Sequence, residues 1–359
     1  MNFQLSEEQE LMRDSFARFL TEQSSMARVR AAQTSGFDPA LWRGLAELGA
    51  FSIRVPETAG GLGLGLLDAS LLMEEAGRPL ASGPLAETLV SARLLATLGG
   101  QDELLDRVMA GEAVLGIALH DLALQPLQWI AGGAVADAVI ARCGDEIVLV
   151  SVGAADRQSE PTLASTPLAE LRLAELPRST LSRGAAGIEA YTQAIEEWKL
   201  LISAALAGLG REALKLAAAY ASQRKQFGQF IGQFQAISHP LADLLCEVDG
   251  GKFLVWKAIR NIADGDAEAG AAVSLAAWWN SESASRAVAQ ALHTFGGYGL
   301  TTEYDIYLFN LRAKAWPLVF GDPQRLLAEA GRRLYAGETT SLPDAGNCPI
   351  NFDLGDDAR

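Results

Sequence analysis

Hydrophobic positions follow a helical period along the first part of the chain. The stretch "LSEEQELMRDSFARFLTEQ" opens with Ser6 followed by acidic residues, which is typical of a capped helix start, and it places Phe16, Phe19 and Leu20 near one stripe. The same spacing recurs in "PALWRGLAELGAF", "LLDASLLMEEAGR", "LAETLVSARLLATLGG" and "DELLDRVMAGE", with Gly and Pro between them. The pattern therefore predicts an all-helical domain over residues 1–112.

A different pattern begins at Val114. The runs "AVLGIAL", "AVADAVIARCG" and "EIVLVSV" are short and apolar or alternating, and "LRLAEL" follows them, which predicts a small β domain over 113–190. Long helical patterns then return, starting with "AIEEWKLLISAALAGLGREALKLAAAYASQRKQFG" and ending with "PQRLLAEAGRRLY", over 191–336. The predicted fold class is α+β and mainly α, with an antiparallel C-terminal helical bundle. The tail, 337–359, has no period and is predicted to be irregular.

Composition and charge narrow the class of protein. The chain has 359 residues with 49% apolar content, enough for two or three domains. Its 44 acidic and 29 basic side chains give a net charge of -15, which argues against DNA, RNA or an anionic membrane surface as the main partner. The start of the chain is interpreted as an amphipathic helix rather than a signal peptide, and no apolar run approaches membrane-spanning length. The three cysteines and three histidines are scattered, so no disulfide framework and no metal site are predicted, which fits a reducing cytoplasm.

The stretch "SQRKQFGQFIGQFQ", residues 222–235, is the most unusual part of the chain. It sets Arg224 and Lys225 beside Phe227 and several glutamines. An arginine fork suits phosphate, glutamine offers a donor and an acceptor, and a phenyl ring offers a flat face, so together these groups suit a nucleotide cofactor. A helix C-terminus whose cations answer the helix dipole, followed by a Gly-rich turn, explains the same residues without a ligand.

Three stretches occur in a characteristic order and separation. They are "VPETAGGLGLGLLDASLLMEEAGR" (55–78), "SQRKQFGQFIGQFQAISHPLADL" (222–244) and "ALHTFGGYGLTTEYDIYLFNLRAKAW" (291–316). The first looks like the Pro-Glu, Gly-Gly, Gly segment of the FAD-dependent acyl-CoA dehydrogenase family. The second is similar to that family's Arg, Phe-Gly, Phe-Gln, Leu-Ala-Asp signature, and the third to its Gly-Gly-x-Gly, Glu-Tyr stretch. The chain thus resembles this family over nearly its whole length, which implies FAD as cofactor and an acyl-CoA thioester as substrate.

The resemblance implies cofactor roles for residues of the second stretch. Arg224 inherits a contact with the flavin pyrophosphate of a neighbouring subunit, and Gln226 and Phe227 line the adenosine half. Gln235 matches the Gln of the family's Phe-Gln pair. A fixed guanidinium suits a charge-assisted contact with phosphate.

The third stretch contributes three more residues. Gly296 and Gly297 match glycines whose lack of a side chain lets the backbone approach the dinucleotide, and His293 stands where a Gln is usual. A helix-end histidine followed by a C-cap turn is the alternative interpretation of these three residues.

The catalytic loop departs from the family. Family members remove the α-proton of the thioester with a carboxylate while the flavin accepts hydride from the β-carbon, and the base is usually a Glu shortly after an Arg-Asp-Ala step. Here that region reads "LRAKAWPLVFGDPQRLL" and aligns Phe320 with the Glu, whereas Asp322 is interpreted as a cap of the last helix. Some relatives place their base at another position, which is Trp198 in this chain. The neighbouring Glu196 and Glu197 are interpreted as acids in the first turn of a helix, where a negative charge interacts favourably with the helix dipole. No catalytic residue is assigned.

The β segment departs from the family as well. The family's Thr-Glu-Pro-Gly loop is absent from "LGIALHDLALQPLQWIAGG", and the whole segment is short. Trp129 either matches the Trp that covers the flavin in relatives or is an indole on a core strand. The β-domain motifs with which this chain would contact its own flavin are therefore predicted to be missing. The motifs that in relatives contact the flavin of a neighbouring subunit are present.

Three hypotheses remain open at this point. The first is a subunit of a hetero-oligomeric acyl-CoA dehydrogenase for bulky substrates, such as steroid side-chain thioesters, whose paralogous partner supplies the catalytic Glu. The second is a self-sufficient homo-oligomeric dehydrogenase with an unusual base such as Asp322 or Glu197, and the third is a flavin-free helical scaffold. The resemblance allows an electron-transfer flavoprotein as a further partner. The Ala-rich faces of 200–221 and 266–290 suit close helix contact, either between subunits or inside one bundle.

Overall fold

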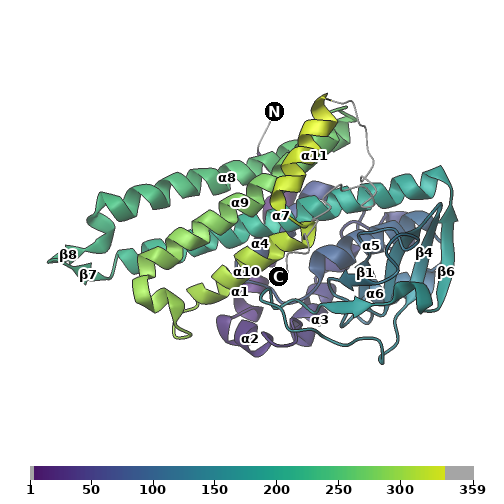
Figure 1. The fold of residues 1–359 in the computed structure, drawn as a ribbon, viewed down its shortest axis with the longest axis horizontal. Coiled ribbons are helices and arrows are strands. Elements are labelled where there is room, and N and C mark those ends of the chain that lie inside the picture. Colours follow the sequence, from purple (N-terminus) through teal and green to yellow (C-terminus); the bar gives the residue numbers. More distant parts are fainter. Residues whose placement is uncertain (1–3, 336–359) are drawn as a thin grey trace, which may run out of the picture.

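The structure, a computed structural model, describes residues 4–335 of the chain, apart from the side chain of Phe320. Figure 1 shows a helical N-terminal part and a small β part at one end of the molecule, and long helices that run from there to a hairpin at the other end. The predicted fold class, mainly helical α+β with a C-terminal bundle, is confirmed.

The N-terminal part is built from short and medium helices. Their bounds are α1 (Glu7–Gln23), α2 (Met26–Ala31), α3 (Pro39–Glu47), η1 (Ala50–Ser52), η2 (Glu57–Ala59), α4 (Leu66–Gly77), α5 (Leu85–Leu98) and α6 (Asp102–Met109). Ser6 caps α1 as predicted, because its hydroxyl accepts from the Gln9 N–H while the Gln9 side chain accepts from the Ser6 N–H. Nearly every residue of α4 and most of α5 are buried, so these two helices form the centre of this part.

The β part contains two sheets. The strands are β1 (Leu115–Ile117), β2 (Gln128–Ile130), β3 (Ala138–Cys143), β4 (Glu146–Ser151), β5 (Ala169–Leu171) and β6 (Arg178–Arg183), with η3 (Leu173–Glu175) before the last of them. The larger sheet has the order β1-β3-β4-β6, in which β1 runs parallel to β3 and the other neighbours are antiparallel. The strands β2 and β5 form a separate antiparallel pair. The predicted change from a helical to a β pattern after Val114 is confirmed.

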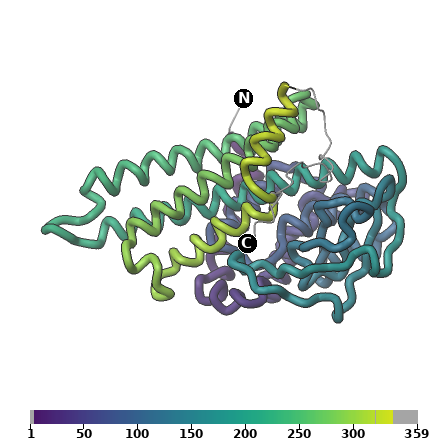
Figure 2. The backbone as a smooth tube through the Cα atoms, viewed as in Figure 1, coloured from purple at the N-terminus to yellow at the C-terminus, as the bar shows by residue number. Residues whose placement is uncertain are grey.

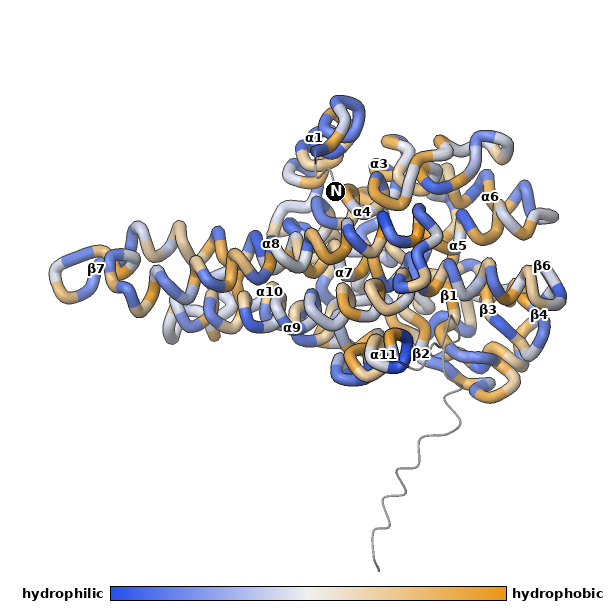
Figure 3. Tube along the Cα trace, turned by 90° about the horizontal axis from the view of Figure 1, so that it is seen from above, coloured by the Kyte–Doolittle hydropathy of each residue, from blue (hydrophilic) through white to orange (hydrophobic). Residues whose placement is uncertain are grey.

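The C-terminal part is a bundle around one long helix. Its elements are α7 (Ala185–Ala221), β7 (Lys225–Gln226), β8 (Gln229–Phe230), η4 (Ile231–Gln233), α8 (Gln235–Asp264), α9 (Ala269–Phe295), η5 (Gly296–Leu300), α10 (Ile306–Ala315), η6 (Trp316–Phe320) and α11 (Pro323–Tyr335). Helix α7 contacts α4 and α5 near the β part and α8 and α9 along the bundle. Figure 2 follows the chain along α7 to the hairpin and back along α8, and Figure 3 shows the hairpin at the end farthest from β6.

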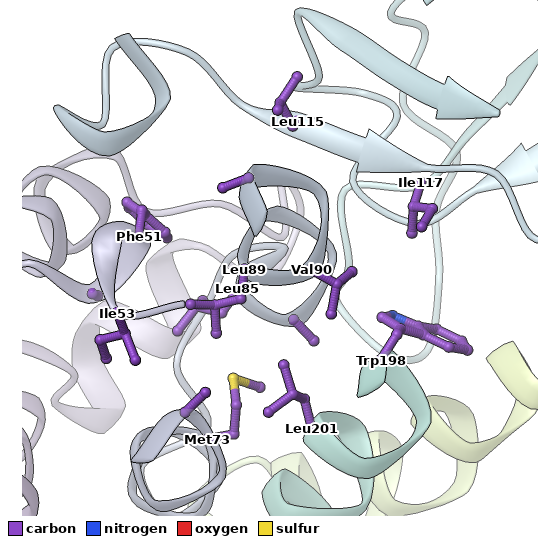
Figure 4. Packing of buried hydrophobic residues seen from close by; sticks show 14 of the residues in the cluster. Phe51, Ile53, Met73, Leu85, Leu89, Val90, Leu115, Ile117, Trp198 and Leu201 are labelled. Atoms are coloured by element: carbon purple, nitrogen blue, oxygen red, sulfur yellow. The ribbon is translucent and has the colours of Figure 1, made fainter. Parts of the chain in front are cut away.

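Two glycines let α4 and α7 cross at backbone distance. A Cβ atom on Gly77 would collide with the carbonyl oxygen of Ala205, and one on Gly208 would collide with that of Glu74. Close approach of the two helices therefore depends on the missing side chains. Figure 4 shows the core next to this crossing, where Met73, Leu85 and Leu201 meet.

The start of α7 differs from the prediction. The helix begins at Ala185, inside the stretch that the sequence pattern assigned to the β domain. Gly184 has a φ of 80° and turns the chain directly from β6 into the helix, and Gly187 leaves room for the side chain of Ser182. A start made of Gly and Ala carries no apolar period, so the pattern could not indicate it.

The Ala-rich faces of 200–221 and 266–290 are used inside the chain. Helices α7 and α9 pack on each other, and alanines of both, such as Ala204 and Ala277, are buried. The intramolecular alternative is therefore correct for these faces.

Candidate functional site

The residues predicted from the second stretch lie where α7 ends and α8 begins. Arg224 follows the end of α7, its N–H donates to the Tyr220 carbonyl, and its own carbonyl accepts from the Ile231 N–H. Its side chain is exposed, its guanidinium carbon lies 5.8 Å from the centre of the Tyr298 ring, and no ion pair joins it to another described residue. These two backbone hydrogen bonds thus fix the main chain of Arg224, while its guanidinium stays exposed.

The hairpin beyond Arg224 presents its side chains to solvent. Phe227 and Gly228 form the two-residue loop between β7 and β8 with φ angles of 53° and 80°, the geometry of a tight hairpin turn. Phe227 is 93% exposed. Gln226 is exposed and donates to the Lys225 carbonyl, and Gln235 is the exposed first residue of α8.

The residues of the third stretch stand at the end of α9, close to Arg224. His293 is exposed in the last turn of that helix, and Tyr220 stacks on Phe295 at 4.3 Å between ring centres, which ties the end of α7 to the end of α9. Gly296 has a φ of 62° and its N–H donates to the His293 carbonyl, so the C-cap alone explains this glycine. Gly297 has no such φ, and space for a Cβ is open there, so the local backbone gives no reason for a glycine.

The structure therefore brings the seven predicted residues to one end of the bundle. They offer a guanidinium, two amides, an imidazole, a phenyl face and an open stretch of backbone, which suit the pyrophosphate and the adenine of a dinucleotide. A ligand pocket normally buries most of its ligand, whereas these side chains face solvent. A dinucleotide held here needs a second surface to cover it.

A cleft lies away from the hairpin, between the N-terminal, β and C-terminal parts. Its volume is about 60 Å³. The lining residues are Gly36, Met73, Ala76, Gly77, Ala81, Gly83, Pro84, Leu85, Ala86, Glu87, Ala131, Gly132, Ser165, Thr166, Pro167, Ile202, Ala205, Trp316 and Val319. The space that these residues enclose is small and holds about four to six water-sized groups.

Part of the cleft wall comes from the segment that replaces the family's catalytic loop. Trp316 and Val319 of η6 line the cleft, whereas the side chain of Phe320, aligned with the family's Glu, lies outside the described part of the structure. Asp322 is exposed and its carboxylate accepts from the Gln324 N–H at 2.9 Å at the start of α11, so its predicted role as a helix cap is confirmed.

Glu87 is a residue of the cleft that the sequence analysis missed. It belongs to the first turn of α5, only 6% of it is exposed, and its carboxylate accepts from the Trp198 indole N–H at 3.1 Å. Burial raises the pKa of Glu87, and the Trp198 hydrogen bond opposes this only in part. The alternative base position, which Trp198 fills, is thus in contact with a carboxyl group from another helix.

Glu197 is held away from the cleft lining by two arginines. Arg54 and Arg93 each place a guanidinium nitrogen 2.8 Å from the same oxygen of Glu197, whose side chain is buried. Both arginines thus hold this carboxylate in a fixed ion-pair geometry. The interpretation of Glu197 as a first-turn acid is wrong, because α7 begins at Ala185 and Glu197 lies in its interior.

Glu196 is also held by ion pairs with basic side chains. Its carboxylate accepts from Lys199 at 3.0 Å and from Arg333 at 2.7 and 3.0 Å, and all three side chains are buried. Burial opposes ionisation of Glu196, but Lys199 and Arg333 outweigh it and hold its pKa below the ordinary value. Its interpretation as a first-turn acid is wrong for the same reason as for Glu197.

Trp129 is not a core residue. It lies on β2 opposite Glu170 of β5, and 54% of it is exposed, so the interpretation as an indole on a core strand is wrong. Ala131 and Gly132, which follow β2, line the cleft. A flavin-covering role of Trp129 stays a prediction.

Possible metal ligands are dispersed over residues 4–335. In this part of the chain, no three or more His, Cys, Asp or Glu side chains gather in a way that could hold a metal ion. No helix of this part is long and apolar enough to cross a membrane.

Comparisons with known proteins agree on one family. The family model described as the acyl-CoA dehydrogenase N-terminal domain matches residues 6–112, and the model of the C-terminal domain matches residues 185–335. The acyl-CoA dehydrogenase IpdE2 of Mycolicibacterium smegmatis is 33% identical over 336 residues, covering 92% of this chain and 99% of that protein.

Solved structures of the same family have the same fold. A steroid acyl-CoA dehydrogenase described as the Tcur3481-Tcur3483 G363A variant superimposes with a TM-score of 0.83 at 28% identity, covering 92% of this chain and 98% of its own. The ChsE4-ChsE5 complex from Mycobacterium tuberculosis superimposes with a TM-score of 0.79 at 24% identity, over 95% of this chain and all of its own.

Proposed function

The chain belongs to the acyl-CoA dehydrogenase family, and we propose that it is a subunit of a hetero-oligomeric enzyme that converts an acyl-CoA thioester to the 2,3-enoyl thioester. In this proposal a paralogous subunit supplies the catalytic glutamate, and the present chain contributes the hairpin end of its bundle to a shared FAD site. The bound FAD supplies the oxidant, which takes up the two electrons and the hydrogen from the β-carbon.

One observation carries the proposal. The residues that suit the pyrophosphate and adenine stand exposed at one end of the bundle, and the described part of this chain leaves them open to solvent. A ligand site normally buries most of its ligand, so a cofactor held here needs a second surface. A second chain that covers this end of the bundle supplies that surface.

Each residue of the hairpin end has a proposed task. Arg224 binds the pyrophosphate through its fork of N–H donors, Gln226 and Phe227 contact the adenosine half, and Gln235 donates or accepts a hydrogen bond there. Gly297 lets the backbone approach the ligand. We also propose that His293 adds an imidazole donor.

The proposed substrate is a bulky acyl-CoA thioester. The description of a structure at 28% identity as a steroid acyl-CoA dehydrogenase supports a steroid-derived acyl group, and an electron-transfer flavoprotein is the proposed electron acceptor. The two described cysteines, Cys143 and Cys246, are unbridged, which supports a reducing cytoplasm as the proposed location.

The absorption spectrum of the purified chain, alone and co-expressed with its paralogue, tests the proposal. We expect flavin only in the co-expressed assembly, with fewer than one FAD per copy of this chain. One tightly held FAD per copy of the chain purified alone would support the self-sufficient homo-oligomeric alternative, and a colourless protein in both preparations would support the flavin-free scaffold.

Substitution of Arg224 tests the contact itself. Arg224→Ala should lower the flavin content of the assembly by roughly tenfold at limiting FAD, because a charge-assisted hydrogen bond to phosphate is lost. The matched control is Arg260→Ala, which removes an exposed guanidinium from the other end of α8 and should leave flavin content unchanged. Equal flavin occupancy in both variants would contradict the proposed contact.

A third experiment asks whether the missing base is the only deficiency of this chain. A positioned base contributes about 10²- to 10⁴-fold, so the chain alone should show negligible acyl-CoA oxidation. Phe320→Glu should not restore turnover in the isolated chain, because the family's Thr-Glu-Pro-Gly loop is missing as well and proton and hydride removal need the same aligned substrate. Turnover by the unmodified chain without a partner would refute the role of the paralogue.

A further inference from the structure

Glu87 is chemically out of place in the cleft. Of the described residues that line the cleft, it is the one with an ionisable side chain, and its neighbours there include Met73, Ile202 and Val319. It forms no ion pair within the described part of the chain. The structure shows one hydrogen bond to it from another side chain, the one from Trp198. A protonated carboxyl group has one donor and several acceptor positions, so hydrogen-bonding capacity remains.

The surroundings favour the neutral form of this group. Arg93 of the same helix is engaged with Glu197, as is Arg54. Burial therefore acts on Glu87 without a compensating cation and raises its pKa. A neutral carboxyl group in an apolar cleft offers both a donor and an acceptor, and it favours neutral oxygen groups over ions as partners.

The rest of the lining determines the shape of a suitable ligand. Nine of the lining residues are Gly or Ala, including Gly77, Ala86 and Ala205. Because these side chains are small, a ligand in the cleft can lie close to the backbone. Trp316 and Met73 supply apolar surface for it to contact. The cleft suits a slender apolar group of about half a dozen heavy atoms or fewer.

We propose that this cleft binds the apolar end of a ligand that carries a neutral hydroxyl or carbonyl oxygen, and that Glu87 recognises this oxygen. Trp198 is the positioning residue, because its indole N–H fixes one carboxyl oxygen of Glu87 and leaves the other for the ligand. Two sources share this chemistry, a free short-chain alcohol or ketone and the oxygen-bearing end of an acyl-CoA chain. The inference does not depend on which subunit supplies the catalytic base.

The test compares ligand pairs of nearly equal shape by calorimetric titration of the full chain, alone and in its assembly. The free pair is 1-butanol and 1-chlorobutane, and the thioester pair is 4-hydroxybutanoyl-CoA and pentanoyl-CoA. Three variants are compared with the unmodified chain: Glu87→Leu, Glu87→Gln, and Glu103→Leu as a matched control that removes an exposed acid from α6. Circular dichroism shows whether each variant is folded.

The expected result is a preference for the oxygen-bearing member of a pair that depends on residue 87. In Glu87→Leu this preference should fall by about tenfold, the factor that one neutral hydrogen bond is worth, whereas Glu87→Gln and Glu103→Leu should keep it within about twofold. A Glu87-dependent preference in only one pair identifies the source of the ligand and still supports the site. The proposal is overturned if the unmodified chain binds neither pair, or if Glu87→Leu keeps the same preference as Glu103→Leu.

Discussion

A buried ionic cluster attaches the last described helix to the bundle, and its removal should have a large and local effect. Arg333 of α11 places its guanidinium 2.7 and 3.0 Å from the oxygens of Glu196 on α7 and 2.6 Å from Glu329 on its own helix. Lys199 completes the cluster with contacts of 3.0 Å to Glu196 and 3.2 Å to Glu329. All four side chains are at most 10% exposed, so solvent screens these charges little.

Replacing Arg333 by leucine leaves two buried carboxylates with one ammonium. Removing one partner of a buried ion pair costs about 3–5 kcal/mol, because the remaining charge lacks compensation. The Gly270 carbonyl, which accepts from Arg333 at 2.6 Å, loses its donor as well. Since total stabilities are only about 5–15 kcal/mol, α11 should detach locally before the whole chain unfolds.

Native-state hydrogen exchange followed by mass spectrometry measures this opening. Amides of α11 should exchange about 10²- to 10³-fold faster in Arg333→Leu, the factor that corresponds to the lower half of the expected free-energy cost. Arg325→Leu is the matched control, because it removes an exposed arginine from the same helix and should change stability by less than about 0.5 kcal/mol. Equal exchange rates in the two variants would show that the cluster contributes no net stabilisation.

Two further predictions follow from single residues. Burial raises the pKa of Glu87, so the stability that its protonation provides is complete below its ordinary pKa and is lost as pH rises through the raised value. Glu87→Gln should therefore gain stability relative to the unmodified chain in urea unfolding as pH rises above the ordinary pKa of a glutamate, and a difference that is constant with pH would contradict the buried carboxyl. Gly208→Ala should lose about 1–3 kcal/mol, because its Cβ meets the Glu74 carbonyl, whereas Gly250→Ala on α8, where space is open, should gain up to about 1 kcal/mol. Similar effects of the two alanines would show that α4 and α7 can separate at little cost.

The sequence predicted those features that depend on neighbours along the chain. The capped start at Ser6, the helix cap at Asp322 and the change of pattern after Val114 each rest on a few consecutive residues. The end of the long helix near Arg224 was also predicted, because the Gly-rich segment after it is typical of a helix C-terminus and a turn.

Features that depend on contacts between distant segments could not be predicted in this way. Glu87 looks like an ordinary first-turn acid of α5, and its burial and its hydrogen bond depend on distant segments such as that of Trp198, more than one hundred residues later. Glu196 and Glu197 were misplaced because the Gly- and Ala-rich start of α7 hid the true beginning of the helix. Their partners, Arg333 and Arg93, come from helices at opposite ends of the sequence.

The hairpin residue Phe227 links the folding argument to the function. Its φ of 53° costs roughly 1–2 kcal/mol for a residue with a side chain, and 93% exposure means that it buries almost no apolar surface in return. Phe234 stands edge-on to it at 6.3 Å between ring centres, a contact worth about 0.5–1.5 kcal/mol that offsets part of that cost. The described part of the chain thus gives only a small reason for a phenyl group at this position, whereas a ligand or a second chain that covers the hairpin gives a larger one. The same reasoning applies to the exposed Arg224 beside it, which makes no ion pair with any described residue, and both observations support a cofactor site completed by another subunit.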